Sequence, residues 1–131
     1  MKKFIITSNI FLLFPVIAAF YAKEWFYFSI ALCVSIFSPI YHYLKESNSK
    51  YLTLLSLVKD FDWLFAIAAY IYMYYFIFTN TQVGLRVWLA IALSLTLIFF
   101  WYGFRFGDYK KTHPWFHIVT ALVSGLIVLS K

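Results

Sequence analysis

The sequence is dominated by apolar runs that are each about as long as a bilayer is thick. Hydrophobic residues make up 64% of the 131-residue chain, and charged residues only 12%. A helix needs roughly 20 apolar residues to cross the hydrocarbon core of a membrane, and too few polar residues remain here to cover a soluble globule. The sequence therefore predicts an integral membrane protein with a single domain over residues 1–131.

We expect an all-α fold of about five transmembrane helices joined by short polar loops. The expected spans are Phe4 to Tyr21, Glu24 to Leu44, Lys59 to Phe78, Gly84 to Phe104, and Pro114 to Ser130. The leucines of YLTLLSLV, residues 51–58, indicate that the third helix begins early, with its first turns along the membrane interface. Pro114 suits the first turn of the fifth helix, with Thr112 or His113 as the capping residue.

The cationic residues predict the orientation, because lysine and arginine near the ends of spans prefer the cytoplasmic side. If the helices alternate, one side carries Lys2, Lys3, Lys45, Lys50, Lys59, Arg105, Lys110 and Lys111, while the other carries only Lys23, Arg86 and Lys131. We therefore expect the N-terminus inside, the C-terminus outside, and a location in the inner cell membrane. The net charge of +6 then serves topology and contact with anionic lipid, so nucleic-acid binding is not needed to explain it.

The first apolar run also has the basic start of a secretory signal peptide, with small residues near a possible cut after Ala22. Phe20, at the third position before that cut, fits a signal peptidase poorly, so an uncleaved anchor is the favoured interpretation. The remaining helices keep the same orientation in either case.

Ionisable residues inside the expected spans gather at one depth. The three histidines, His42, His113 and His117, lie near the inner ends of the second and fifth helices. Counted from the outer ends at 1.5 Å per residue, they lie about 20 to 27 Å deep, and Asp62 and Ser38 lie about 24 and 21 Å deep. Such residues are costly inside a membrane and usually functional, so we interpret this layer as a site.

Helical phase places these residues on shared faces. Ser38 and His42 are four residues apart, as are His113 and His117, so each pair lies on one side of its helix. The single cysteine, Cys33, lies about half a turn out of phase with His42 and is not counted as a ligand. It also excludes an intrachain disulfide.

Two acids compete for the same role on the third helix. Asp60 and Asp62 point about 200° apart, so only one of them can face the site. The face of Asp62 continues with small alanines that suit close helix packing, whereas the face of Asp60 continues with large aliphatic residues. Asp62 is therefore the preferred inward acid, and Asp60 is the alternative.

Three neutral imidazoles from two helices, with no thiolate nearby, suit a tetrahedral Zn²⁺ whose fourth position holds water. Such an ion lowers the pKa of water towards about 7 and polarises a carbonyl. Asp62 can then accept a proton and deliver it to a leaving amine or alcohol, and the Ser38 hydroxyl can donate a hydrogen bond to an oxyanion. Haem is an alternative cofactor, although two axial ligands would leave one histidine unexplained. A metal ion that has only a structural role, or one that serves a ligand-gated sensor, is a further alternative.

The motifs SPIYH (residues 38–42), KDFDWLFA (residues 59–66) and HPWFH (residues 113–117) resemble the CREST superfamily of membrane hydrolases. That superfamily includes alkaline ceramidases, adiponectin and progestin receptors, and lipid-remodelling proteins of GPI anchors. The resemblance implies zinc ligands at His42, His113 and His117, a hydroxyl at Ser38, and an acid at Asp62 or, as second choice, Asp60. Members of that superfamily have a bundle of seven helices, two more than we expect here. Because two is an even number, the last helix keeps the same orientation in the membrane.

We therefore expect a zinc-dependent hydrolase that cleaves an amide or ester bond of a membrane lipid near the cytoplasmic face, as a ceramidase or a phospholipase does. The alternative is a non-enzymatic lipid receptor or small membrane scaffold with a structural metal, for which Asp62 would supply a fourth ligand. Five helices offer less wall around a lipid chain than seven, so we expect either a homodimer or a cavity open to the bilayer.

Overall fold

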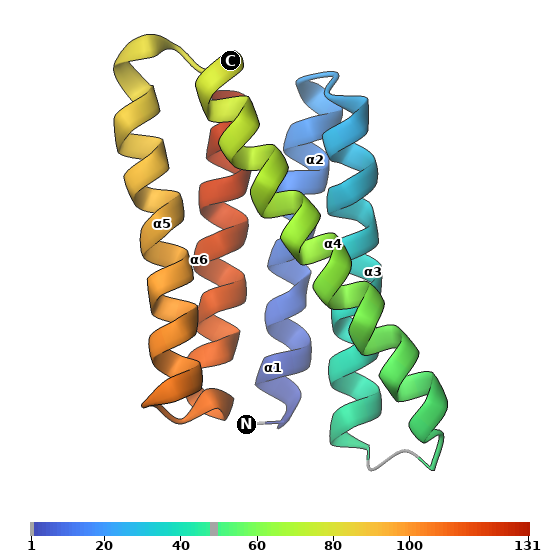
Figure 1. Ribbon diagram of the computed structural model, residues 1–131. Coiled ribbons are helices and arrows are strands. Elements are labelled where there is room, and N and C mark those ends of the chain that lie inside the picture. Colours follow the sequence, from blue (N-terminus) through green and yellow to red (C-terminus); the bar gives the residue numbers. More distant parts are fainter. Residues whose placement is uncertain (1, 48–49) are drawn as a thin grey trace.

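The computed structural model describes residues 2–47 and 50–131, which form a bundle of helices with no strand among them (Figure 1). The helical segments of membrane-spanning length and hydropathy in this part of the chain are Lys3–Tyr21, Trp25–Glu46, Leu52–Thr79, Val83–Arg105 and Tyr109–Leu129. Each expected span corresponds to one of these helices. The predicted all-helical membrane fold is therefore confirmed, with shifted helix boundaries.

The first span is not one regular α-helix. Helix α1 (Lys2–Ser8) continues as a 3₁₀ turn, η1 (Asn9–Leu12), and then as α2 (Leu13–Tyr21). Pro15 supplies a physical reason, because it has no N–H to donate to the carbonyl of Phe11 in a regular helix. The side chains of Ser8 and Asn9 are buried at this break.

Helix α4 (Leu52–Thr79) crosses the bundle diagonally and packs mainly against α3 (Trp25–Glu46) (Figure 1). It begins well before Lys59, which confirms the early start that the leucine-rich segment predicted. Because of this oblique path, one half of α4 lies beside α3 and the other half approaches the remaining helices.

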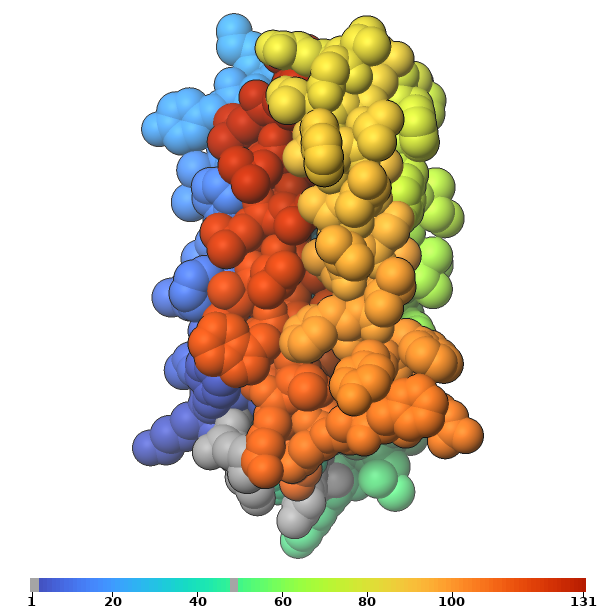
Figure 2. Space-filling view, turned by 90° about the vertical axis from the view of Figure 1, so that its left-hand side faces the viewer, coloured from blue at the N-terminus to red at the C-terminus, as the bar shows by residue number. Residues whose placement is uncertain are grey.

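Helices α5 (Val83–Arg105) and α6 (Tyr109–Leu129) form an antiparallel pair, with α6 between α5 and the first span (Figure 2). Helix α6 begins ahead of the expected Pro114 because Asp108 caps it, and the Asp108 carboxylate accepts a hydrogen bond from the Lys110 N–H at 3.1 Å. The predicted cap at Thr112 or His113 is therefore wrong, and Pro114 lies inside the helix rather than in its first turn.

The two ends of the bundle differ in packing. The buried apolar core lies towards the end that carries the C-terminus, where Tyr27, Phe76, Ile77, Leu93 and Ile127 are almost fully buried. The opposite end carries the N-terminus, the end of α3 and the α5–α6 turn (Figure 1). The histidines lie towards this second end.

Candidate metal centre

The structure brings all three histidines of the chain into one buried cluster. His42 comes from α3, and His113 and His117 come from successive turns of α6. Their side chains are 2%, 7% and 5% exposed, respectively. One ring nitrogen from each lies within 4.8 Å of the others, an arrangement that can hold a metal ion. The sequence analysis expected this grouping from depth and helical phase.

The shortest distance in the cluster joins the two facing ligand helices. The Nε2 atoms of His42 and His113 are 3.1 Å apart. Two nitrogens bound to one tetrahedral Zn²⁺ at about 2.0–2.1 Å would be roughly 3.3 Å apart. The separation is therefore close to the one that zinc requires.

Aromatic packing fixes the His113 ring. The Tyr109 ring stacks on it, with centroids 4.3 Å apart and planes 24° apart, and the Phe116 ring lies 5.7 Å away at 26°. The ammonium group of Lys45 lies 5.1 Å from the centroid of the Tyr109 ring. The cluster is thus covered by aromatic rings, with a cation beyond them on the side of the α3 terminus.

Each ligand helix also carries a proline within one turn of its histidine. Pro39 lies between Ser38 and His42 in α3, and Pro114 directly follows His113 in α6. A proline inside a helix removes one backbone hydrogen bond to the carbonyl four residues earlier. Both α3 and α6 therefore lack a backbone bond close to the histidine side chains.

The first span contributes a contact that depth and helical phase did not predict. The Ser8 Oγ atom lies 3.3 Å from Nδ1 of His117, and the Ser8 side chain is 1% exposed. The adjacent Asn9 is also buried, and its Nδ2 donates to the carbonyl of Ile5 at 2.7 Å. The signal in the sequence was the run TSN, residues 7–9, which interrupts an otherwise apolar span.

Asp62 and Ser38 lie beside the histidines. Both side chains line the same cavity as His113 and His117. Asp60 is exposed and is not among the residues that line this cavity. The preferred acid and the hydroxyl therefore both reach the cavity, whereas the alternative acid does not.

The histidine cluster offers three protein ligands for an ion, one fewer than a tetrahedral site needs. Among the described residues, the group of side chains that can share one ion contains the three histidines and no carboxylate or thiolate. Asp62 lies outside this group, as does Cys33, which is a free, half-buried thiol. An ion bound here would keep a position for a non-protein ligand, as catalytic zinc sites do.

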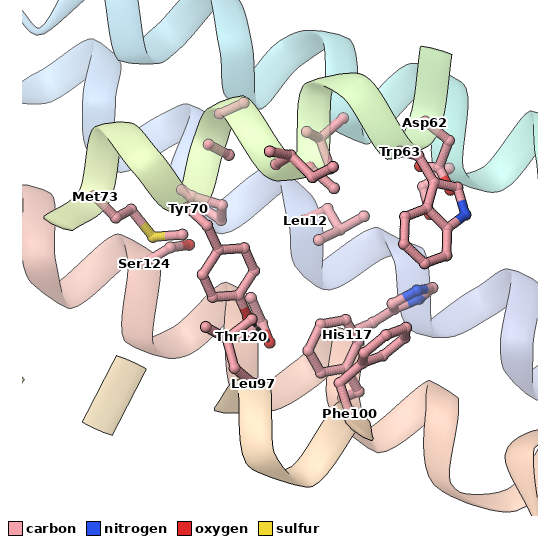
Figure 3. Close-up of a pocket in the computed structure, with 18 of the residues that line it drawn as sticks. Leu12, Asp62, Trp63, Tyr70, Met73, Leu97, Phe100, His117, Thr120 and Ser124 are labelled. Atoms are coloured by element: carbon pink, nitrogen blue, oxygen red, sulfur yellow. Dashed lines mark hydrogen bonds between the residues drawn. The ribbon is translucent and has the colours of Figure 1, made fainter. Parts of the chain in front are cut away.

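A cavity of about 460 Å³ extends from the histidines into the bundle. Figure 3 shows Asp62 and His117 at one end of it and Tyr70 and Ser124 at the other. Every span of the chain contributes to its wall, which is mostly apolar.

The cavity is open at the side, between α4 and α5. Trp63 and Ile67 of α4 and Leu97 of α5 line it and are nevertheless 47%, 52% and 38% exposed. Apolar residues exposed in this part of a membrane span face lipid chains. The side opening corresponds to the expectation of a cavity accessible from the bilayer.

Hydrogen bonds join three helices towards the far end of the cavity. The Tyr70 hydroxyl lies 2.8 Å from Thr96 Oγ1 and 3.3 Å from Thr120 Oγ1. Thr96 donates its proton to the carbonyl of Leu93 at 2.7 Å, so Tyr70 donates to Thr96. Tyr70 thus links α4 to α5 and to α6, close to Tyr27 and Met73, which belong to the apolar core and also line the cavity.

The donor set and the burial of the cluster fit a bound cation. Burying polar rings costs free energy unless their nitrogens find partners, and the Nε2 atoms of His42 and His113 face each other at 3.1 Å, where one ion could bind both. The other ring nitrogen of His113, Nδ1, has no hydrogen-bond partner in the described part of the protein. Three imidazoles without a thiolate are ligands that Zn²⁺ accepts readily. An ion shared by the three rings would offset the cost of burying them.

Comparison of the chain with protein-family models, curated proteins and solved structures finds no match. The resemblance to membrane hydrolases therefore rests on three short motifs and on the cluster that they form.

Proposed function

We propose that this protein is a zinc-dependent intramembrane hydrolase that cleaves an amide or ester bond of a lipid. The observation that carries the proposal is the buried cluster of His42, His113 and His117 at the polar end of an apolar cavity. An apolar cavity with a few convergent polar groups is the usual form of a ligand site. Here the apolar part suits an acyl chain, and the polar part suits its carbonyl.

The chain's own residues divide the work of such a reaction. His42, His113 and His117 would hold Zn²⁺, which supplies a Lewis acid for the carbonyl and a source of nucleophilic water. Asp62 lies on the cavity wall without being a ligand, so its carboxylate is available to accept a proton and to return it to the leaving amine or alcohol. Ser38 lies on the same wall, where its hydroxyl would donate a hydrogen bond to the developing oxyanion.

The side opening supports entry of the substrate from the bilayer. A lipid whose chain passes between Trp63 and Leu97 would keep its headgroup near the end of the bundle that carries the histidines. The connections at this end are rich in lysine and arginine, which supports its placement on the cytoplasmic side of the inner cell membrane. The aromatic and apolar cavity wall would exclude water from the rest of the lipid's acyl chain.

Metal analysis of the detergent-purified protein tests the first part of the proposal. We expect about one zinc per chain in the wild type and a clear loss in His117→Ala. Folded wild-type protein without bound metal, after incubation with zinc, would overturn the proposal. An absorption spectrum of the same sample tests the haem alternative, because haem gives an intense visible band and zinc gives none.

Lipid hydrolysis tests the second part, and the chain provides a matched control. Ceramides and phospholipids are incubated with zinc-loaded wild type, Asp62→Asn and Asp60→Asn, and released fatty acid is measured. We expect Asp62→Asn to lose about 10²- to 10⁴-fold in rate, the usual contribution of a general acid–base group. Its zinc content should stay unchanged, because Asp62 is not a ligand. The exposed Asp60→Asn should retain the wild-type rate.

A different outcome separates the enzyme from the receptor. Tight lipid binding with bound zinc but no product from any lipid would favour the non-enzymatic lipid receptor. Equal rates in wild type and Asp62→Asn would remove Asp62 from the mechanism.

A further inference from the structure

Ser8 lies outside the motifs that resemble the hydrolase superfamily, yet it touches a member of the histidine cluster. It is the last residue of α1, directly before the 3₁₀ turn that interrupts the first span. Its Oγ atom lies 3.3 Å from Nδ1 of His117, and both side chains are buried. Burial of both groups lowers the local dielectric, which strengthens such a contact.

The direction of the Ser8–His117 hydrogen bond follows from counting protons. A serine hydroxyl has one proton and two lone pairs. Ser8 donates its proton to the carbonyl of Ile5 at 2.8 Å, so its oxygen is left as an acceptor towards His117. This arrangement is satisfied when His117 carries its proton on Nδ1, and its lone pair is then on Nε2.

We propose that Ser8 is a positioning residue of the metal centre, which holds His117 in the Nδ1–H tautomer so that Nε2 is free to bind the ion. The inference rests on the proposed zinc site and adds a role for the first span. Metal-binding histidines generally donate their second N–H to an oxygen that fixes the tautomer and the ring orientation. Among the described residues, Ser8 is the one whose side chain makes such a contact with Nδ1 of His117.

The break in the first span accounts for the position of Ser8. Its hydroxyl donates to the carbonyl of Ile5 in the preceding turn of α1. The 3₁₀ segment that follows changes the helical phase between Ser8 and α2. The first span therefore presents Ser8 to α6 at the level of the histidines while α2 packs apolar residues against α3 and α6 further along.

The first experiment determines the tautomer of His117 directly and requires no metal. Zinc-free protein labelled with ¹⁵N-histidine is compared by NMR with Ser8→Ala and Ser35→Ala, and the ring signals are assigned with His117→Ala. Ser35 is the matched control, because its hydroxyl also donates to a carbonyl three residues earlier at 2.8 Å and, among the described residues, has no hydrogen bond to a histidine. We expect the Nδ1–H form of His117 in wild type and Ser35→Ala, and a mixture of tautomers in Ser8→Ala. The Nε2–H form in wild type would overturn the proposal.

The second experiment measures zinc affinity by competition with a chromophoric chelator. Removing such an outer partner typically weakens metal binding about 10- to 100-fold, so we expect that loss in Ser8→Ala and wild-type affinity in Ser35→Ala. A residue that only packs would lower the stability of the zinc-free protein and leave the zinc affinity unchanged, and that result would overturn this inference alone. Wild type that binds no zinc at all would instead overturn the proposed function.

Discussion

If the cluster binds zinc as proposed, replacing His42 by alanine should remove the stabilisation that the ion would give to the fold. His42 is the one member of the cluster on α3, whereas His113 and His117 are both on α6. An ion held by all three therefore joins two helices that are far apart in the sequence. In His42→Ala the two remaining ligands belong to a single helix.

The size of the effect follows from linkage between binding and folding. An ion that binds only the folded state adds about 2.7 kcal/mol of stability at a free concentration of 100 times Kd, and about 1.4 kcal/mol for each further tenfold increase. A membrane helix stays helical when the bundle comes apart, so a pair of histidines on α6 binds zinc equally in both states. The zinc-dependent increment of His42→Ala should then be close to zero.

The assay is reversible unfolding in mixed micelles at several zinc concentrations, scored by the change in stability that zinc causes. This comparison cancels the cost of losing the buried His42 side chain itself. His117→Ala is the informative control, since it leaves His42 and His113 on different helices and should keep a reduced increment. A full increment in His42→Ala would refute the reasoning, because zinc would then be binding elsewhere.

Two further predictions concern packing and are measured by the same unfolding assay. Tyr70→Phe removes the hydroxyl that links α4 to α5 and α6. A typical hydrogen bond between membrane helices contributes about 0.6 kcal/mol, so losing both should lower the stability by roughly 1 kcal/mol. Unchanged stability would mean that another contact replaces the link. Gly125→Ala places a Cβ atom against the Phe14 ring, where α2 and α6 approach closely, and should cost about 1–3 kcal/mol by overpacking. Gly84→Ala, which meets no atom within 4 Å, should leave the stability unchanged or slightly raised.

The sequence predicts the spans well because membrane helices must satisfy their backbone internally, so that an apolar run of sufficient length has few alternatives. The predicted boundaries differ from the observed ones, and α6 shows why. Pro114 is typical of a helix start, but the helix already begins after the cap at Asp108, six residues earlier. Pro114 therefore lies inside α6, where it leaves the carbonyl of Lys110 without its helical donor.

The histidine cluster was predictable because two i, i+4 pairs and a common depth leave little freedom in how α3 and α6 can face each other. The choice of Asp62 over Asp60 followed the small residues that share its face, and the structure does place Asp62 on the cavity wall. Ser8 was missed for a different reason. Its contact depends on the phase of an irregular helix, and the 3₁₀ turn that sets this phase has no simple sequence period.

The prolines of α3 and α6 bear on which ions the cluster can select. Each leaves a carbonyl without its helical donor close to the histidines, at Ser35 and at Lys110. A helix bends most easily at such a point, so the ring nitrogens can adjust to ionic radii larger or smaller than that of zinc. A site whose ligands can shift in this way discriminates poorly between ions of different size. Its preference must come from the affinity order of imidazole for different divalent metals. We therefore expect Co²⁺ and Ni²⁺ to occupy the cluster in place of zinc, whereas Ca²⁺ and Mg²⁺, which require oxygen ligands, are excluded.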